Sequence, residues 1–177
     1  MSRLDVYVDS DKKNTIENPE EITAILSNHN VTFSQWQANA TLDHTSTQEQ
    51  VIAAYQPFVS DLMAKSGFQS VDVVSLHPEH PQKAQFRAKF LNEHTHSDDE
   101  VRFFVDGSGL FYLHFGNIVY GLLCEKGDLI SIPANTEHWF DMGENPSFKC
   151  IRLFTDPAGW VAQFTGSEIA SNYPLHS

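Results

Sequence analysis

The sequence is poor in cysteine, and this absence argues against one class of small protein. It has only two cysteines, Cys124 and Cys150, and both stand in apolar runs, GLLCEKG and FKCIRLF. A disulfide framework in a small secreted domain needs more cysteines than this. We therefore interpret both residues as buried thiols.

Long apolar runs are also missing, and so is a charged start that leads into an apolar stretch. Without a run of about 18 apolar residues the sequence predicts no membrane-spanning helix. Without the charged and apolar start it predicts no signal peptide. We expect a cytoplasmic protein that has no membrane partner.

Positive charge is scarce. Lysine and arginine number 11 against 23 aspartates and glutamates, which gives a formal net charge of −12 at pH 7. This balance disfavours nucleic acid as a partner. No linker, repeat or low-complexity segment divides the chain, and its 177 residues fit one domain. We expect a single domain over 1–177 and take a monomer as the working hypothesis.

Helical signals occupy the N-terminal part, over about 18–67. Asn18 is a good N-cap, and Pro19 suits the first helical position. A longer helix is predicted over 47–65, and Pro57 should kink or split it. The segment 11–21 is polar and is interpreted as turn-rich.

Strand signals begin near residue 71, where short β-branched and aromatic segments alternate with turn residues. DGSG (106–109) and GN (116–117) are interpreted as hairpin turns. This pattern predicts a mainly β fold with helical additions, an antiparallel jelly-roll barrel. Its core should span about 71–155, and residues 165–177 should form a loose tail.

Four potential metal ligands stand in two short segments. His94, His96 and Glu100 come first, and His138 follows on a second strand. Alternate residues of a strand point to the same side, so the two histidines of the first segment share a face. Glu100 joins them if the chain stays extended or bulges. Three imidazoles and a carboxylate suit iron, nickel, manganese, copper or zinc better than calcium, and leave room for substrate or dioxygen.

The spacing of these ligands resembles the two motifs of the cupin superfamily. The first runs HTHSDDEVRFFVDG over 94–107, and the second runs GDLISIPANTEH over 127–138. Asn135 stands where the second motif usually has glycine. Asparagine is the next best residue for a positive φ, so we expect the turn to be kept.

A longer stretch is similar to the acireductone dioxygenase family. It comprises HTHSDDEVRFFVDGSGLFYLH (94–114) and FTDPAGWVAQF (154–164), and the likeness extends from about Val71 to Phe164. The resemblance implies one Fe(II) or Ni(II) per chain on the four ligands. It also implies cleavage of the acireductone 1,2-dihydroxy-3-keto-5-(methylthio)pentene by O2 in methionine salvage. The iron form would give 2-keto-4-methylthiobutyrate and formate. The nickel form would give 3-methylthiopropionate, formate and carbon monoxide.

Arg102 is the candidate catalytic residue. It follows Glu100 by two positions, so on a strand it shares that inward face. A guanidinium inside a phenylalanine-rich barrel needs an anionic partner. We interpret Arg102 as holding a substrate oxygen and stabilising the enolate. The alternative is a salt bridge to Asp98, Asp99 or another carboxylate.

Other candidates surround this site. Arg152, in the alternating strand FKCIRLF, is a second candidate for binding substrate, and Asp99 for orienting a ligand histidine. His114 is interpreted as a satisfied strand histidine, with a fifth ligand as the alternative. For the aromatic residues the alternative is core packing. The candidates for walls of a pocket for the methylthioethyl tail are Phe90, Phe104, Phe140 and Trp160.

Two other functions stay open on the sequence. One is another cupin dioxygenase with the same ligands and a different substrate. The other is a non-catalytic cupin that binds a small molecule. The inward arginine and the open metal positions disfavour the second, and a substrate-specific oxygen-uptake assay would separate the first.

Overall fold

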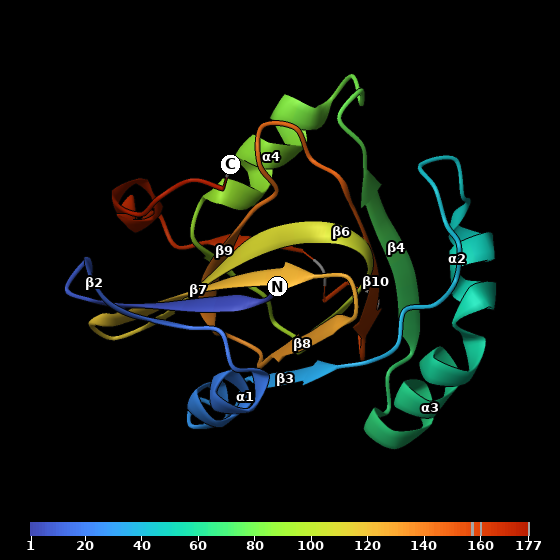
Figure 1. Ribbon diagram of the computed structural model, residues 1–177, viewed down its shortest axis with the longest axis horizontal. Coiled ribbons are helices and arrows are strands. Elements are labelled where there is room, and N and C mark those ends of the chain that lie inside the picture. Colours follow the sequence, from blue (N-terminus) through green and yellow to red (C-terminus); the bar gives the residue numbers. More distant parts are fainter. Residues whose placement is uncertain (157, 160, 177) are drawn as a thin grey trace.

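A computed structural model describes residues 1–156, 158–159 and 161–176. Strands make up most of its regular structure, and helices flank them (Figure 1). The helices are α1 (Pro19–Ser27), α2 (Gln48–Ala54), α3 (Gln56–Ser66), α4 (Lys83–Leu91) and a 3-10 helix (Ile169–Asn172). The strands are β1 (Arg3–Val8), β2 (Asp11–Ile16), β3 (Thr32–Gln35), β4 (Ser70–Leu76), β5 (His94–Thr95), β6 (Glu100–Phe115), β7 (Ile118–Glu125), β8 (Asp128–Ile132), β9 (Glu137–Asp141), β10 (Phe148–Phe154) and β11 (Gln163–Phe164).

The strands form two antiparallel sheets that share β6. The first half of β6 pairs with β8 and β10, and β3 and β4 extend that sheet on either side. The second half pairs with β7 and β9 in a sheet of order β11-β5-β9-β6-β7-β1-β2. The two inner faces enclose the barrel interior. This confirms the predicted mainly β barrel with helices in the N-terminal part.

The bend in β6 corrects one turn prediction. DGSG is not a hairpin, because β6 continues through it from one sheet into the other. Gly107 has a φ of +69°, and a Cβ there would lie 1.8 Å from the Ser147 carbonyl oxygen. A glycine turn signal marks a bulge as readily as a hairpin. The GN turn does form the expected hairpin, between β6 and β7.

The N-terminal helices follow their local signals. The Asn18 side chain accepts hydrogen bonds from the backbone of Glu20 and Glu21 and caps α1. The predicted long helix is split into α2 and α3 around Tyr55, with Pro57 in the first turn of α3, as expected. Both helices lie beside β4 on the outer face of its sheet (Figure 1). Within the described ranges, no helix is long and apolar enough to cross a membrane.

Two segments differ from their predictions. The polar segment after residue 10 forms β2, which pairs with β1. The segment expected to be a loose tail packs on the barrel, where Tyr173 is buried against Tyr7 and Trp139. The backbone N–H of His176 donates to the Asp141 carboxylate at 2.8 Å. The packing of the C-terminal segment depends on partners far away in the sequence, whereas β2 pairs with its neighbour β1 through a turn at Asp9 and Ser10, both of which have a positive φ.

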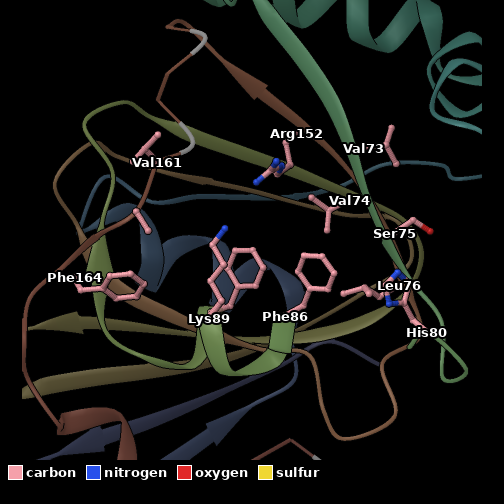
Figure 2. A pocket seen from close by; sticks show the side chains of 12 residues that line it. Val73, Val74, Ser75, Leu76, His80, Phe86, Lys89, Arg152, Val161 and Phe164 are labelled. Atoms are coloured by element: carbon pink, nitrogen blue, oxygen red, sulfur yellow. The ribbon is translucent and has the colours of Figure 1, made fainter. Parts of the chain in front are cut away.

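Helix α4 covers one side of the barrel and leaves a cavity of about 420 Å³ beside β4 and β10 (Figure 2). The wall is mainly apolar, and Lys89 and Arg152 contribute charge. The lining residues are Val73, Val74, Ser75, Leu76, His80, Phe86, Lys89, Phe90, Arg152, Val161, Ala162 and Phe164.

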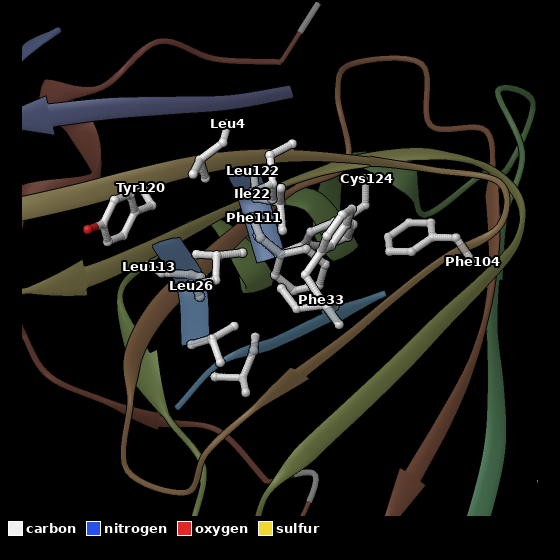
Figure 3. Close-up of a cluster of buried hydrophobic side chains, with 14 of the residues drawn as sticks. Leu4, Ile22, Leu26, Phe33, Phe104, Phe111, Leu113, Tyr120, Leu122 and Cys124 are labelled. Carbon is white, nitrogen blue, oxygen red and sulfur yellow. The ribbon is translucent and has the colours of Figure 1, made fainter. Parts of the chain in front are cut away.

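An apolar core fills the barrel interior (Figure 3). Phe104 belongs to it and is fully buried against Phe111 and Phe148. Cys124 and Cys150 are buried and free, in agreement with their interpretation as buried thiols. The strands that pack on this core also carry the polar residues described next.

Candidate metal centre

The ligand candidates lie where short strands meet the start of β6. His94 of β5 pairs directly with His138 of β9, and His138 also pairs with Leu113 of β6. Glu100 is the first residue of β6. Hydrogen-bonded strands therefore set the spacing of side chains that are far apart in the sequence.

The four side chains converge in the protein interior. Ring nitrogens of His94, His96 and His138 lie within 4.8 Å of one another. An oxygen of Glu100, Oε2, lies 3.3 Å from His96 Nε2 and 3.1 Å from His138 Nε2. All four residues are buried, with at most 4% of their surface exposed. The structure thus brings together the three imidazoles and the carboxylate that the sequence proposes.

Backbone carbonyls orient each imidazole. A carbonyl oxygen only accepts hydrogen bonds, so each Nδ1 carries a proton, and in a neutral ring Nε2 is then the nitrogen that can bind a metal. The three contacts are His94 Nδ1 with Asn92 O at 2.8 Å, His96 Nδ1 with Val161 O at 3.2 Å, and His138 Nδ1 with Thr136 O at 2.8 Å. His138 Nε2 also lies within hydrogen-bond distance of Glu100 Oε2, the proposed ligand beside it.

The site fits a divalent transition metal. His96 Nε2 is buried and has no hydrogen-bond partner among the described residues, a costly state that a metal ion would relieve. Burial lowers the pKa of His94 to about 4 and also lowers the pKa of His96. Both rings are therefore neutral at pH 7, as ligands must be.

These shifts predict acid sensitivity of the metal-free protein. The unfolded His94 takes up a proton below its ordinary pKa of 6.5, whereas the folded residue does so only near 4. The unfolded state thus binds more protons in this window, and the free energy of unfolding falls as pH falls. His94 alone contributes about 1.4 kcal/mol per pH unit. Urea unfolding with a chelator measures this slope, which His94→Gln should reduce; a flat profile in both proteins would contradict it.

Arg102 lies beside the ligands. Its Nε donates to Glu100 Oε1, so the salt-bridge alternative holds with Glu100 as partner and not with Asp98 or Asp99. Burial alone would raise the pKa of Glu100, but the Arg102 guanidinium and the hydrogen bond from His138 hold it well below its usual range. Another nitrogen of the same guanidinium, Nη1, is buried and has no hydrogen-bond partner within the described part of the chain.

Aromatic rings surround this guanidinium. Its carbon lies 5.8 Å from the ring centre of Phe90 and 5.3 Å from those of Phe111 and Phe140. Phe90 also lines the cavity next to α4. The guanidinium therefore stands between the ligand cluster and that cavity.

The other predicted aromatic residues have different places. Phe140 is buried against Phe90, behind the cavity wall, and Phe104 packs in the core rather than in that wall. Trp160 lies outside the described residues. Phe164, which is not among the predicted residues, lines the cavity with its ring 5.9 Å from that of His94. Its signal was its place at the end of FTDPAGWVAQF.

Arg152 faces the cavity but already has a partner. It pairs with Asp72 through two hydrogen bonds, of 2.9 and 2.7 Å. It also stands directly opposite Arg102 in the β6–β10 pair, and so shares its face. Because Asp72 of β4 already neutralises its charge, Arg152 should contribute less than Arg102 to binding an anion.

Asp99 does not orient a ligand histidine, which corrects that expectation. Its Oδ1 accepts from the backbone N–H of Ala134 at 2.8 Å, and the histidines are held by carbonyls instead. The turn it holds contains Asn135, whose φ of 64° confirms the expected positive value. The N–H of Asn135 donates to the His96 carbonyl at 2.8 Å. Asp99 thus acts on the backbone beside a ligand.

Comparison with known proteins gives close relatives. The chain matches the model of the ARD/ARD' family over residues 4–162. It is 55% identical to the acireductone dioxygenase of Aquifex aeolicus (strain VF5), over 99% of this chain and 97% of that protein. It is 54% identical to that of Klebsiella oxytoca, over 98% of each. The likeness therefore includes the helices, the barrel and the ligand cluster.

A solved structure shows the same architecture. It is an acireductone dioxygenase from Bacillus anthracis with a cadmium ion in its active center, with a TM-score of 0.82 and 27% identity. The match covers 93% of this chain and 98% of that one. It confirms the cupin fold that the sequence predicts.

Proposed function

The chain belongs to the ARD/ARD' family, that of acireductone dioxygenases, and from this premise we propose the reaction it catalyses. It cleaves 1,2-dihydroxy-3-keto-5-(methylthio)pentene with O2 in methionine salvage. With iron the products are 2-keto-4-methylthiobutyrate and formate. With nickel they are 3-methylthiopropionate, formate and carbon monoxide.

One observation carries the proposal at the level of the site. The Arg102 guanidinium is buried beside the ligand cluster, and its Nη1 has no partner among the described residues. A buried N–H donor without an acceptor costs about 1–3 kcal/mol. An oxygen of an anionic enediolate would supply that acceptor. Arg102 therefore provides local positive charge in a chain whose net charge is −12.

The ligand residues would hold one Fe(II) or Ni(II) per chain. His94, His96 and His138 offer Nε2, and Glu100 offers a carboxylate that Arg102 keeps ionised. When bound, the ion supplies Lewis-acid chemistry and a template for a chelating substrate. The cadmium ion in the Bacillus anthracis relative supports a divalent ion at this place.

The cavity beside α4 suits the apolar end of the substrate. Phe86, Val74 and Phe164 line it (Figure 2), and so does Phe90. Phe164 joins the cavity to the ligand cluster through its contact with His94. A methylthioethyl tail in this space would leave the oxygens of the enediolate near Arg102. The apolar wall would also keep water away from the reacting carbons.

Metal exchange tests the proposed reaction. The ligand set of three imidazoles and one carboxylate discriminates poorly between iron and nickel, so each ion should load. We expect carbon monoxide from the nickel-loaded protein and 2-keto-4-methylthiobutyrate from the iron-loaded protein. Headspace gas analysis and chromatography of the acids measure both.

The same experiment separates the alternatives. Equal carbon monoxide from both forms, or none with nickel, contradicts the proposed product switch. No consumption of the acireductone by either form, with oxygen uptake on another substrate, favours a different cupin dioxygenase. Binding of metal and acireductone without turnover favours a non-catalytic cupin.

A further inference from the structure

His114 lies between two glutamates at the back of the ligand strands. Its Nδ1 is 2.6 Å from Glu93 Oε2 and 3.0 Å from Glu137 Oε2. Its Nε2 is 2.8 Å from the Gly116 carbonyl oxygen. Glu93 is buried, with 2% of its side chain exposed, whereas Glu137 is half exposed. The described site does not use this cluster.

The two glutamates are the residues immediately before two ligands. Glu93 precedes His94, and Glu137 precedes His138. Successive side chains of a strand point to opposite faces, so the glutamates lie behind the sheet that presents the ligands. His114 pairs with Glu137 across β6 and β9, one position from the pair of Leu113 with His138.

The cluster also reaches β11. Thr165 donates from its hydroxyl to Glu93 Oε1 at 2.8 Å and from its backbone N–H to the Glu93 carbonyl at 3.1 Å. Its neighbour Phe164 pairs with His94 and lines the cavity. Through Glu93 and Glu137, one imidazole therefore connects β6, β9, β5 and the end of β11.

The contacts indicate that this imidazole is an imidazolium ion. A carbonyl oxygen faces Nε2 and two carboxylates face Nδ1, and all of these groups accept hydrogen bonds. Burial alone would lower the pKa of His114, but its contact with the Glu93 carboxylate raises it. The cation also offsets repulsion between two carboxylates, one of them buried.

We propose that His114 is a positioning residue for the metal site. Its bridge to Glu93 and Glu137 fixes β5 against β9, and hence His94 against His138. This role rests on the proposed metal site. It means that contacts of His114 on the opposite face of the sheet help to set the geometry of the metal ligands. Without the bridge, backbone pairing still places His94 beside His138, but their imidazoles should be held less firmly in the geometry that a metal needs.

Cobalt(II) is the probe for the test, because its absorption bands in the visible range report coordination geometry. We compare the wild type with His114→Ala, His114→Asn and the control His29→Ala. His29 also makes a side-chain hydrogen bond, of 3.1 Å to the Tyr120 hydroxyl, but has no contact with either glutamate among the described residues. In asparagine the amide nitrogen is as many bonds from Cα as Nδ1 is, so it keeps a donor and loses the charge.

We expect the cobalt bands of His114→Ala to shift and its cobalt dissociation into excess chelator to be about 10- to 100-fold faster, as for other residues that orient metal ligands. His114→Asn should lie between His114→Ala and the wild type, and His29→Ala should match the wild type. If His114→Ala does not fold, the spectrum and dissociation rate of His114→Asn decide the question.

Three results would overturn the inference. The first is a wild-type spectrum and dissociation rate in the folded His114 variants, which would leave His114 with stability alone. The second is a second bound cobalt that His114→Ala loses, because the cluster would then be a metal site of its own. The third is an equal change in His29→Ala. A wild type that binds no cobalt would instead refute the proposed metal centre itself.

Discussion

His138→Ala should leave a folded protein that no longer binds metal stoichiometrically and has no measurable turnover. His138 supplies one of the three imidazoles, and its Nε2 lies 3.1 Å from Glu100. Alanine leaves two imidazoles and a carboxylate around the space that the ring had filled, one protein ligand short of the proposed set. His96→Ala should behave alike, because it removes the ring whose Nε2 is buried without a partner among the described residues. Elemental analysis after gel filtration measures metal per chain.

His80→Ala is the matched control for these variants. His80 lines the cavity, but its Nδ1 accepts from the backbone N–H of Gln82 at 3.1 Å and it is not one of the proposed ligands. Its removal should leave the metal content at one ion per chain. Circular dichroism checks the fold of all three variants. Full metal occupancy in both His96→Ala and His138→Ala would remove the proposed centre.

Local signals in the sequence predicted the elements whose causes are local. Asn18 caps α1 through its own side chain, and Pro57 ends the continuity of one helix because of its ring. Gly107 shows the limit of such signals. The glycine predicted a turn, but the Ser147 carbonyl that makes glycine necessary there lies 40 residues further along the sequence. The sequence alone therefore could not tell a bend between sheets from a hairpin.

The candidate site was readable for a similar reason. Three ligands fall within 94–100, and their side chains bear the chemistry, so type and spacing were enough. The groups that orient them were not readable, because every residue has a backbone carbonyl and nothing marks Thr136 or Val161 as acceptors. The contact of His114 with Glu93 also needs the strand register. Residue identity fixed the ligands, and the fold supplies their orientation.

Arg102 depends on both kinds of information. Strand alternation in the sequence predicted that its side chain points inward, and only the fold shows which groups it contacts. One end binds Glu100, and the other end has no partner among the described residues. The first contact keeps a proposed ligand ionised and oriented. The second is the one that a substrate oxygen would complete. A substitution here should therefore affect turnover more than metal content, because the metal ion itself offsets the charge of Glu100.

Arg102→Ala should keep one metal per chain and lose most of its turnover. A buried charge-assisted contact to the reacting group is worth about 2–4 kcal/mol in the transition state, or roughly 30- to 1000-fold in rate. Arg102→Lys should recover only part of this, because lysine lacks the planar fork through which a guanidinium can bond Glu100 and substrate in fixed directions. Steady-state rates on metal-loaded protein, with metal content measured on the same samples, test this.

The design of this test separates catalysis from folding. Removing Arg102 leaves Glu100 as a buried carboxylate without its cation, so the metal-free variant should be less stable by about 3–5 kcal/mol. The metal-loaded variant should regain much of this loss, and its rate is therefore the relevant one. Arg152→Ala is the comparison, because Arg152 lines the cavity on the same face but is paired with Asp72. A loss in Arg152→Ala as large as in Arg102→Ala would mean that general positive charge in the cavity matters, and not the free Nη1. Near-normal turnover of metal-loaded Arg102→Ala would assign Arg102 to holding Glu100 alone.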